Sequence, residues 1–376
     1  MSVRSFAILF AVAMTAALFA AWVTIARDTG SGLRGNGELM FPDLAGRVND
    51  VRTIKVMRAN FVSTVEGKEK DGSVAWSLKE RDGYPVPIEI VRAVAAGMAQ
   101  LRQIEAKTAR PRLYSRIHVD DPKTSKESKA ALVELFDTRG ASMASLIVGL
   151  DKAGILSIGD IYVRRPNEER AWLAHGKVPV PDKQVGWLNQ MIVEVDLPRV
   201  RETTLFVPGE EPLRVFKKTA DDRDFTLEGL PKDRELKELF GAEDISRAIQ
   251  TLTFEEVKRA ADLGFDLSSQ PRARHVTFDG LILEVWAREV EGKLWVAVKA
   301  RPDPESADPA KVDKAKIEAE VRKIGAVTDG WAYTLNDFET RNLKKTMANM
   351  TQPRDAPKAE SKDAPKAKSN GAPKAN

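Results

Sequence analysis

The sequence predicts an α+β fold: one N-terminal transmembrane helix, two tandem units of antiparallel sheet plus helix, and a disordered tail. Three observations predict it. Residues 6–25 carry no charge, residues 41–350 mix strand-like and helix-like segments, and the order of those segments repeats after about 150 residues. With 43% hydrophobic and 30% charged residues, the 376-residue chain can build folded cores and has the composition of a membrane segment only at its start.

The first element is the stretch FAILFAVAMTAALFAAWVTI at residues 6–25, which lies between Arg4 and Arg27. Its length matches a hydrocarbon layer of about 30 Å at about 1.5 Å of rise per residue. We therefore expect residues 1–27 to form an uncleaved signal anchor, with the N-terminus in the cytoplasm and the bulk of the chain exported. Cleavage is the alternative, because Thr24-Ile25-Ala26 could serve as a cleavage site.

Residues 28–40, DTGSGLRGNGELM, are rich in glycine and are predicted to form a flexible stalk. Gly30, Gly32 and Gly35 have the spacing of a dinucleotide-binding loop. Such a loop needs a buried strand before it and a helix after it, because the phosphate binds at the helix N-terminus. The segment before these glycines is instead the predicted membrane helix, so we expect no nucleotide cofactor.

The first predicted unit covers residues 41–195. Strand-like alternation of apolar and polar residues is found at 51–56, 74–78, 131–137, 144–150, 161–165 and 170–174. The last four of these segments are predicted to form two hairpins, because turn residues separate them in pairs. Residues 86–104 have helical periodicity after the turn signal Asp82-Gly83-Tyr84-Pro85, and a short helix near residues 187–192 closes the unit.

The second predicted unit covers residues 196–350 and repeats this order of signals. Strand-like segments lie at 200–207, 213–217, 224–227, 276–288 and 293–300, and helical segments at 231–252 and 308–324. Aligning Trp76-Ser77-Leu78 with Phe225-Thr226-Leu227, each followed by a helix, gives a repeat of about 150 residues. An internal duplication is therefore a hypothesis, and its alternative is two α+β domains that resemble each other by chance.

Residues 351–376 are predicted to be a disordered tail, because Ala-Pro-Lys recurs there and the composition cannot build a core. The tail holds six lysine or arginine residues against three acidic ones, whereas the formal net charge of the whole chain is +4. The rest of the chain is therefore close to neutral, and we expect no nucleic-acid partner. The chain has no cysteine, which excludes disulfides, thiolate metal sites and a cysteine nucleophile.

Candidate catalytic and metal-binding residues are few. The three histidines, His118, His175 and His275, have no ligand-type neighbours at short spacing, so we interpret them as ordinary surface or hairpin residues. The acidic pairs Asp120-Asp121 and Asp221-Asp222 could split their pKa values as catalytic carboxylates do. Adjacent side chains rarely point together, however, so solvated loops are favoured for both pairs.

The tryptophans are interpreted as structural. Trp76, Trp172, Trp286 and Trp295 lie in strand-like segments, which favours core packing over a sugar-binding surface. Trp22 lies near the exported end of the membrane segment, where indole rings anchor at the interface. Gly-x-Ser-x-Gly elbows, phosphate-binding loops and EF-hand loops do not occur in the sequence. We therefore predict no catalytic residue, no cofactor-binding residue and no metal ligand, and a protein that is not an enzyme.

Several short motifs follow one another in a particular order: Phe41-Pro42-Asp43-Leu44, Trp76-Ser77-Leu78, Gly83-Tyr84-Pro85-Val86, Ile158-Gly159 with Tyr162-Val163, Trp187, and Trp331-Ala332-Tyr333. Over residues 41–343 this order resembles a family of bacterial envelope proteins called domain of unknown function 4340. The resemblance implies a single-span protein of the bacterial inner membrane with tandem α+β units in the periplasm. Such proteins are often encoded beside gliding-motility-type ABC transport components. The family has no agreed activity, so it implies no catalytic residue.

The predicted anchor, the motif search and this resemblance lead to one main hypothesis. We expect a non-enzymatic, membrane-anchored extracytoplasmic accessory protein that contacts the lipid bilayer through residues 6–25 and binds an ABC-type transport or other envelope complex. Two alternatives stay open. One is a periplasmic module that binds a ligand or a cell-wall polymer through a cleft between the units and the basic tail. The other is an unrecognised hydrolase whose groups converge only in the folded chain.

Overall fold

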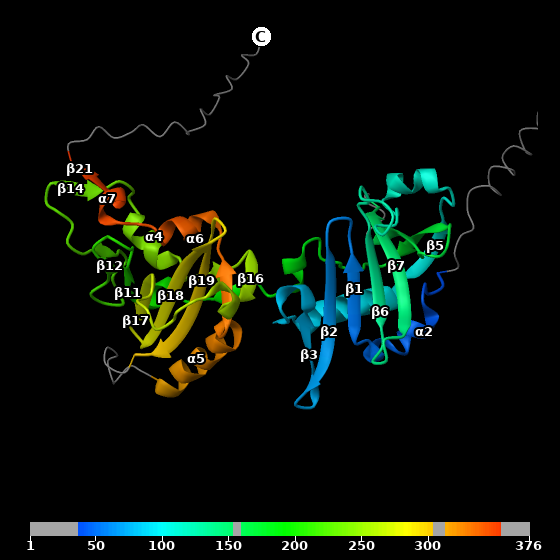
Figure 1. Cartoon of the computed structure of the whole chain (residues 1–376), viewed down its shortest axis with the longest axis horizontal. Helices are drawn as coiled ribbons and strands as arrows, with labels where there is room; N and C mark the ends of the chain where they lie inside the picture. The colour runs from blue at the N-terminus through cyan, green and yellow to red at the C-terminus, as the bar shows by residue number, and fades with distance from the viewer. Residues whose placement is uncertain (1–36, 153–158, 304–312, 355–376) are drawn as a thin grey trace, which may run out of the picture. The chain divides into compact units, whose positions relative to one another are not determined.

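The computed structural model describes residues 37–152, 159–303 and 313–354. The predicted membrane segment, residues 28–36 of the stalk and residues 355–376 of the tail lie outside these residues. The described ends of the stalk and tail are folded, contrary to the prediction. The Met40 N–H donates to the Leu101 carbonyl at 2.7 Å, and residues 351–353 form a strand. No helix of the described residues is long and apolar enough to cross a membrane. The fold is α+β and rich in sheet, as predicted. The chain divides into two compact units between Gln190 and Met191, five residues before the predicted boundary, and Figure 1 shows both units.

The first unit is built on one sheet of nine strands, in which every neighbouring pair is antiparallel. In sheet order these strands are β4 (Tyr84–Pro85), β3 (Ser73–Leu78), β2 (Val62–Lys70), β1 (Thr53–Met57), β6 (Ala131–Phe136), β7 (Ser142–Asp151), β8 (Asp160–Arg164), β9 (Ala171–His175) and β5 (Arg102–Ala106). The two predicted hairpins are confirmed as β6–β7 and β8–β9. β2 is not among the predicted strands, because its second half is polar and exposed and hides the alternation of its first half.

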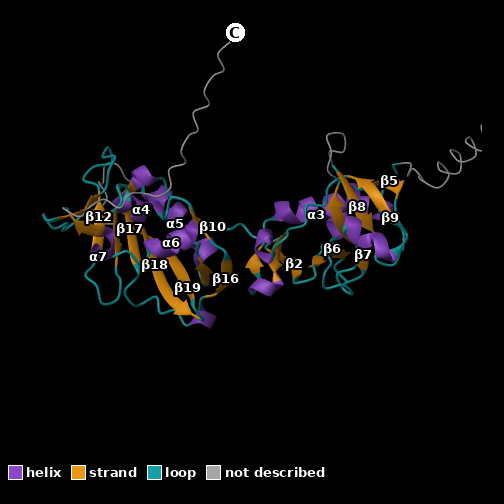
Figure 2. Cartoon of the chain, turned by 90° about the horizontal axis from the view of Figure 1, so that it is seen from above, coloured by secondary structure: helices purple, strands orange, loops and turns teal. Residues whose placement is uncertain are grey.

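Helix α3 (Ile88–Gln100) is the longest helix of the first unit and lies along its sheet (Figure 2). It buries Val91, Val94 and Met98 on one side. It ends four residues earlier than predicted, because the following residues pair with β9 as strand β5. The shorter helical elements of this unit are α2 (Pro42–Ala45) and the 3₁₀ helices η1 (Val48–Asp50), η2 (Lys79–Arg81), η3 (Pro111–Ile117) and η4 (Gln184–Trp187).

The second unit is built on an antiparallel sheet of eight strands. In sheet order these are β13 (Thr226–Leu227), β12 (Leu213–Phe216), β11 (Val200–Leu205), β17 (Ala273–Thr277), β18 (Leu281–Val290), β19 (Lys293–Pro302), β20 (Trp331–Thr334) and β16 (Glu256–Arg259). Two small sheets pair β10 (Met191–Val193) with β15 (Leu252–Thr253), and β14 (Arg234–Leu236) with β21 (Thr351–Pro353). The helical elements are α4 (Gly241–Arg247), α5 (Lys314–Thr328), α6 (Asp337–Asn342), α7 (Met347–Met350), η5 (Leu197–Arg199) and η6 (Ala261–Leu263).

Within residues 231–252, where helical segments are predicted, α4 is the one helix and residues 234–236 form strand β14. Two further predicted elements differ from the structure. The strand predicted at residues 276–288 is two strands, because β17 ends at Thr277 and a turn follows. The Thr277 hydroxyl closes this turn by accepting a hydrogen bond from the Leu281 N–H at 2.9 Å and donating one to Asp279. The short helix predicted near residues 187–192 is the end of η4 followed by β10, whose backbone pairs with β15. In the first place a local turn interrupts the strand pattern, and in the second a tertiary strand pairing overrides the helical pattern.

The two large sheets have the same strand order. Apart from the edge strand β4, the first sheet has the order β3-β2-β1-β6-β7-β8-β9-β5, and the second has the order β13-β12-β11-β17-β18-β19-β20-β16. At each place in the two sheets, the strands also have the same rank in the order of the chain. In both units a three-stranded meander is followed by a helix, a strand at the far edge, and four strands that return through the sheet. The units differ in their insertions, since α5 lies between β19 and β20 whereas residues 165–170 join β8 to β9 directly. This shared order supports the duplication hypothesis.

The pairing register matches as well. One row of paired residues runs through Leu78, Val65, Ile54 and Leu135 in the first unit, and through Leu227, Val215, Thr203 and His275 in the second. The two motifs aligned by sequence, which end in Leu78 and Leu227, therefore occupy the same place in the two sheets. Every other position of these strands can be compared by counting from this row.

Candidate ligand site in the second unit

A second row of side chains lies three residues farther along the same strands and on the opposite face of each sheet, because successive strand residues alternate between faces. In the first unit this row is Met57, Leu132 and Ile147. In the second unit the register places Phe206, Arg272 and Trp286 at the corresponding positions. The two rows are therefore equivalent in position, but their arginines stand at different places. The first row continues from Ile147 to Arg164 of β8, whereas the second has Arg272 at the place of Leu132.

In the first unit the chain between β5 and β6 covers this face. Tyr114 of η3 and Val119 join the row in one hydrophobic cluster. Leu132 and Ile147 are fully buried there. Arg164 of β8 holds the covering segment in two ways, because its Nε–H donates to the Val119 carbonyl at 3.1 Å and its guanidinium stacks on the Tyr114 ring at 4.5 Å. This face of the first unit is part of its core.

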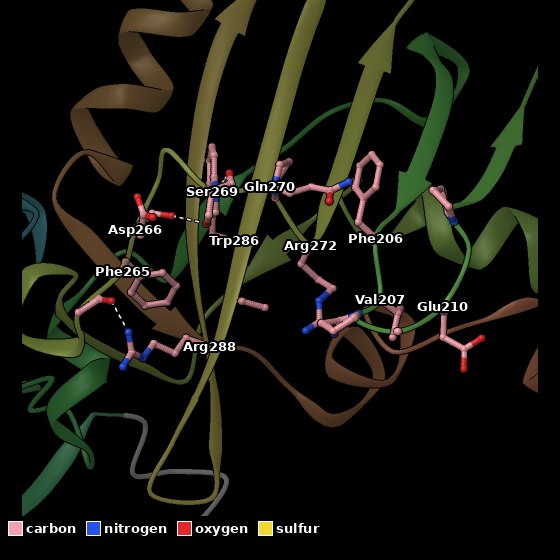
Figure 3. A pocket seen from close by; sticks show the side chains of 16 residues that line it. Phe206, Val207, Glu210, Phe265, Asp266, Ser269, Gln270, Arg272, Trp286 and Arg288 are labelled. Carbon is pink, nitrogen blue, oxygen red and sulfur yellow. Dashed lines mark hydrogen bonds between the residues drawn. The ribbon is translucent and has the colours of Figure 1, made fainter.

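In the second unit the corresponding connection is shorter and covers only part of this face. Leu263 and Phe265 pack with Trp295 of β19 and Ala332 of β20, but the row of Phe206, Arg272 and Trp286 borders a cavity. Residues 260–272 join β16 to β17, whereas residues 107–130 join β5 to β6. The shorter connection leaves a cavity of about 630 Å³, lined by the loop after β11, by residues 264–272 and by β18 (Figure 3). Ligand pockets in proteins have volumes of about 300–1,000 Å³. The cavity is therefore large enough for a ligand or a short peptide segment.

Aromatic side chains form the apolar wall of the cavity. Trp286 of β18 is buried, and its Nε1–H donates to the Ser269 carbonyl at 3.0 Å, which fixes the orientation of the ring. Phe206 and Phe265 are half-buried and also line the cavity (Figure 3). Phe206 and Phe265 therefore offer the exposed part of the apolar wall to a ligand, whereas Trp286 is only 6% exposed.

Arg272 is the charged group of this row. It is half-buried, and its guanidinium makes no hydrogen bond or ion pair with any residue that the structure describes. Burial lowers the pKa of Arg272, and no neighbouring carboxylate raises it. On the same face of β17, by contrast, Arg274 is paired with Glu284 at 2.9 Å. A partly desolvated guanidinium without a counter-charge favours an anionic ligand, because its planar fork can bind a carboxylate through two parallel hydrogen bonds.

The other charged residues of the lining leave Arg272 without a partner. Glu210 is exposed and points away from Arg272 (Figure 3). Asp266 is used within its own turn, where hydrogen bonds from the Ser268 side chain and backbone lower the pKa of the Asp266 carboxyl. Arg288 is exposed at the rim and donates to a backbone carbonyl there. The cavity is therefore positive around Arg272.

The first unit contains a smaller cavity of about 350 Å³, lined among others by Arg58, His118 and Lys129. Here the arginine is used by the fold, because Arg58 donates to the carbonyls of Pro181 at 3.3 Å and Val180 at 3.4 Å. His118 ends η3 with a left-handed backbone, at a φ of 54°. This cavity is a weaker candidate than the cavity of the second unit.

The remaining histidines have different surroundings. His175 lies on the surface, as predicted, and its Nδ1 contacts Asp160 at 3.0 Å. His275 is not a surface residue. It is buried, with Nδ1 at 2.9 Å from the Thr203 hydroxyl, which in turn accepts a hydrogen bond from Ser246 of α4 at 3.0 Å. Burial lowers the pKa of His275 to about 3, so the ring is neutral near pH 7.

The acidic pairs shape loops, as predicted. Asp121 accepts a hydrogen bond from the Lys123 N–H at 2.8 Å, and Asp222 accepts from the Thr219 N–H at 3.1 Å. Within residues 37–152, 159–303 and 313–354, no group of three or more histidine, aspartate or glutamate residues is placed to hold a metal ion. The glycine-spaced loop at residues 30–35 lies outside the described residues.

The tryptophan prediction is correct for three of the four residues. Trp76, Trp286 and Trp295 are buried, whereas Trp172 is half-buried. Sequence reasoning missed that Trp286 also faces a cavity, and it gave Arg272 no role. The one sequence signal for this site is the shorter connection before β17, which becomes visible only after the repeat has been aligned.

Glu339 of α6 is a second buried titratable group, outside the cavity lining. Its Oε2 atom has no hydrogen-bond partner among the described residues. Burial raises the pKa of the Glu339 carboxyl to about 7, and the nearby charge of Glu255 adds to the rise. The second unit therefore contains an acid and a base, Glu339 and His275, whose pKa values are shifted in opposite directions.

No family model, no curated protein and no solved structure matches this chain. The resemblance to the domain of unknown function 4340 therefore stays a prediction that rests on the order of short motifs. Of those motifs, Trp76-Ser77-Leu78 ends β3 and Trp331-Ala332-Tyr333 begins β20, so both have a structural place inside a sheet.

Proposed function

We propose that this chain is a non-enzymatic accessory protein that is anchored in the bacterial inner membrane and binds an envelope complex through its second, periplasmic unit. One observation carries the proposal. The row of side chains that the chain itself covers in the first unit borders a cavity in the second, where it combines aromatic rings with the unpaired Arg272. Concave apolar surfaces with a few placed charges are typical of binding sites.

The proposed location rests on the sequence. Residues 6–25 have the length of one membrane span, and Arg4 on the short N-terminal side favours a cytoplasmic N-terminus. The motif order that resembles the domain of unknown function 4340 points to an ABC-type transport component as the partner. The proposed partners are therefore the lipid bilayer and proteins of the envelope.

The proposal is tested with the full-length chain in its own membrane. A photo-reactive amino acid at Gln270, which lines the cavity, should cross-link to a protein of the envelope complex. The same group at Arg322 of α5, whose side chain is 71% exposed, serves as the control and should not. Extraction in mild detergent should recover the same partner. A chain that cross-links to no protein from position 270 and co-purifies with no membrane protein would contradict the proposal.

A second candidate is a module that binds an anionic cell-wall polymer. Phe206 and Phe265, both half-buried, offer faces for sugar rings in the cavity that Arg272 lines, and Arg272 can pair with a carboxylate or phosphate. Pull-down on isolated cell walls tests this candidate with the full chain, the chain truncated after Gln352, and Arg272→Leu. Retention that disappears with Arg272→Leu would favour the polymer. Retention that disappears with the tail and with added salt would place binding in the tail.

A further inference from the structure

The first unit shows what kind of object fits on this face of the sheet. Its occupant is a short polypeptide turn, η3, which presents the Tyr114 ring to the apolar row. Arg164 on the sheet contacts that turn through the Val119 carbonyl and the face of the Tyr114 ring. The filled face therefore has three parts: an apolar row on the sheet, an aromatic ring from the covering segment, and an arginine that holds the segment.

The same face of the second unit has the sheet parts of this arrangement and a cavity where the covering segment would lie. Phe206 and Trp286 supply the apolar row, and Arg272 supplies the arginine. The two arginines differ in position and in pairing. Arg164 stands on β8 beside Ile147, whereas Arg272 stands at the place that Leu132 takes in the first unit. Arg164 is satisfied by backbone carbonyls at 3.0 to 3.3 Å, whereas the Arg272 guanidinium has no partner among the described residues. Arg272 therefore has its full hydrogen-bonding capacity for a charged acceptor.

We propose that this cavity binds a short segment of a partner protein that presents an aromatic side chain next to an aspartate or glutamate. The aromatic ring packs on Phe206 beside the buried Trp286, at the row on which Tyr114 packs in the first unit. The carboxylate pairs with Arg272. The inference rests on the proposed function and adds the place and the chemistry of the contact with the envelope partner.

The size and charge of the cavity fit such a segment. About 630 Å³ is the volume of a small-ligand pocket, so a turn that projects from a partner can enter it whereas a folded domain cannot. Arg288 lies exposed at the rim and can attract a second acidic residue of the segment. We therefore expect the preferred segment to carry acidic residues on both sides of its aromatic residue.

The first test uses the full-length chain in detergent micelles and blocked synthetic peptides. The probe carries Glu-Tyr-Glu between glycines, one comparison peptide replaces both glutamates by glutamine, and another replaces tyrosine by alanine. Titration calorimetry should detect binding of the probe. Each comparison peptide should bind at least about tenfold more weakly than the probe. These comparisons use only the unaltered protein, so they do not depend on any variant folding correctly.

The second test changes the arginine. Arg272→Leu should weaken binding of the probe by about tenfold or more, and Arg272→Lys by less, because lysine keeps the charge but not the paired hydrogen bonds. Leucine is the residue at the equivalent place in the first unit, Leu132, so the sheet should accept it. Arg322→Leu removes an equal charge from α5 and should leave binding unchanged. Equal binding of the glutamate and glutamine peptides, or unchanged binding by Arg272→Leu, would overturn the inference.

The result can be separated from that of the proposed function. If the unaltered chain co-purifies with a membrane complex and Arg272→Leu does so equally well, the inference fails while the accessory role stands. If the unaltered chain co-purifies with no membrane protein, the proposed function fails and the inference falls with it. Binding of inorganic phosphate or of a cell-wall polymer, without binding of the Glu-Tyr-Glu peptide, would overturn the inference in favour of another class of ligand.

Discussion

The two units share a strand order but differ in what covers their sheets. In the first unit the long connection after β5 buries Leu132 and Ile147 in a hydrophobic cluster. In the second unit the shorter connection after β16 leaves the equivalent residues, Arg272 and Trp286, beside a cavity. The difference teaches that the same row of a sheet can belong to the core in one unit and border a cavity in the other, when the covering connection is shorter and arginine stands in the place of leucine.

The opposite faces of the two sheets differ in polarity. Ile54 and Leu135 meet there in the first unit, and both are fully buried. Their counterparts in the second unit are Thr203 and His275, which share a hydrogen-bonded chain with Ser246 of α4. Such a chain favours one arrangement of helix and sheet, because other arrangements would leave a buried polar group unpaired. It also gives the second unit a titratable group where the first has an apolar one.

The largest expected difference between the units is found in acid. The pKa of His275 is about 3 in the folded chain, against 6.5 for a free histidine, so the unfolded chain binds the extra proton between these values. The stability that neutral His275 contributes is present above pH 6.5 and is lost as the pH falls toward 3. The loss is about 1.4 kcal/mol per pH unit and about 5 kcal/mol in all. Hydrogen exchange should show β11 and β17 losing protection in acid while β1 and β6 keep theirs.

Two variants sharpen this prediction. Glu339 has the opposite pH dependence between its free pKa of 4.5 and its folded value of about 7, so the loss caused by His275 is clearest in Glu339→Gln. Thr203→Ile with His275→Leu installs the apolar pair of the first unit and should remove the acid sensitivity of β17. An unchanged acid sensitivity in this double variant would exclude His275 as its source.

The next effect concerns the segments that cover the two sheets. Tyr114→Ala should lower the stability of the first unit by about 3 kcal/mol, because it leaves a void over a buried row. Phe265→Ala in the second unit should lower stability by only about 1 kcal/mol, because Phe265 is half-buried beside an open cavity. Urea unfolding, followed by hydrogen exchange in β6 and β17, measures both. Equal losses would mean that the second face is covered as well as the first.

Much of the fold follows from local patterns. The hairpins β6–β7 and β8–β9 are predicted because alternating segments with turn residues between them are strong local signals. The alignment of Trp76-Ser77-Leu78 with Phe225-Thr226-Leu227 places β3 and β13 at the same sheet position. The end of α3 was missed, because residues 102–106 become a strand only through pairing with β9, which is distant in the sequence.

The candidate site could not be predicted, for the same physical reason. Arg272 and Arg274 are two residues apart in one alternating strand pattern, so the sequence does not distinguish them. Only the cross-strand register shows that Arg274 lies opposite Glu284, which neutralises its charge. Trp286 was correctly placed in the core, but its cavity arises from the length of the neighbouring connection rather than from its own strand. The cavity exists because the connection between β16 and β17 is short. The strands that line the cavity therefore carry no sequence motif that would reveal it.

A smaller effect is expected at Glu339, whose helix α6 has no counterpart in the first unit. The raised pKa means that the folded state favours the protonated acid, so this group stabilises the fold below pH 4.5 and loses that contribution as the pH rises through about 7. Glu339→Gln should therefore stabilise the second unit by about 2 kcal/mol above pH 7 and change little in acid. Urea unfolding at both pH values tests this, with the exchange of β1 and β6 as internal reference. An equal effect at both values would rule out ionisation as the cause.

The smallest expected effect is on stability at the site itself. Arg272→Leu replaces a half-buried, unpaired guanidinium by the residue of the first unit, so the second unit should gain up to about 1 kcal/mol while peptide binding is lost. Arg274→Leu is the matched control two residues away. It should lower stability, because Glu284 would keep only Arg301 as a partner. Urea unfolding of both variants measures whether each substitution raises or lowers the free energy of unfolding. A gain at Arg272 with a loss at Arg274 would mark Arg272 as a residue retained for binding, whereas a loss at both would mean that this face still belongs to the core.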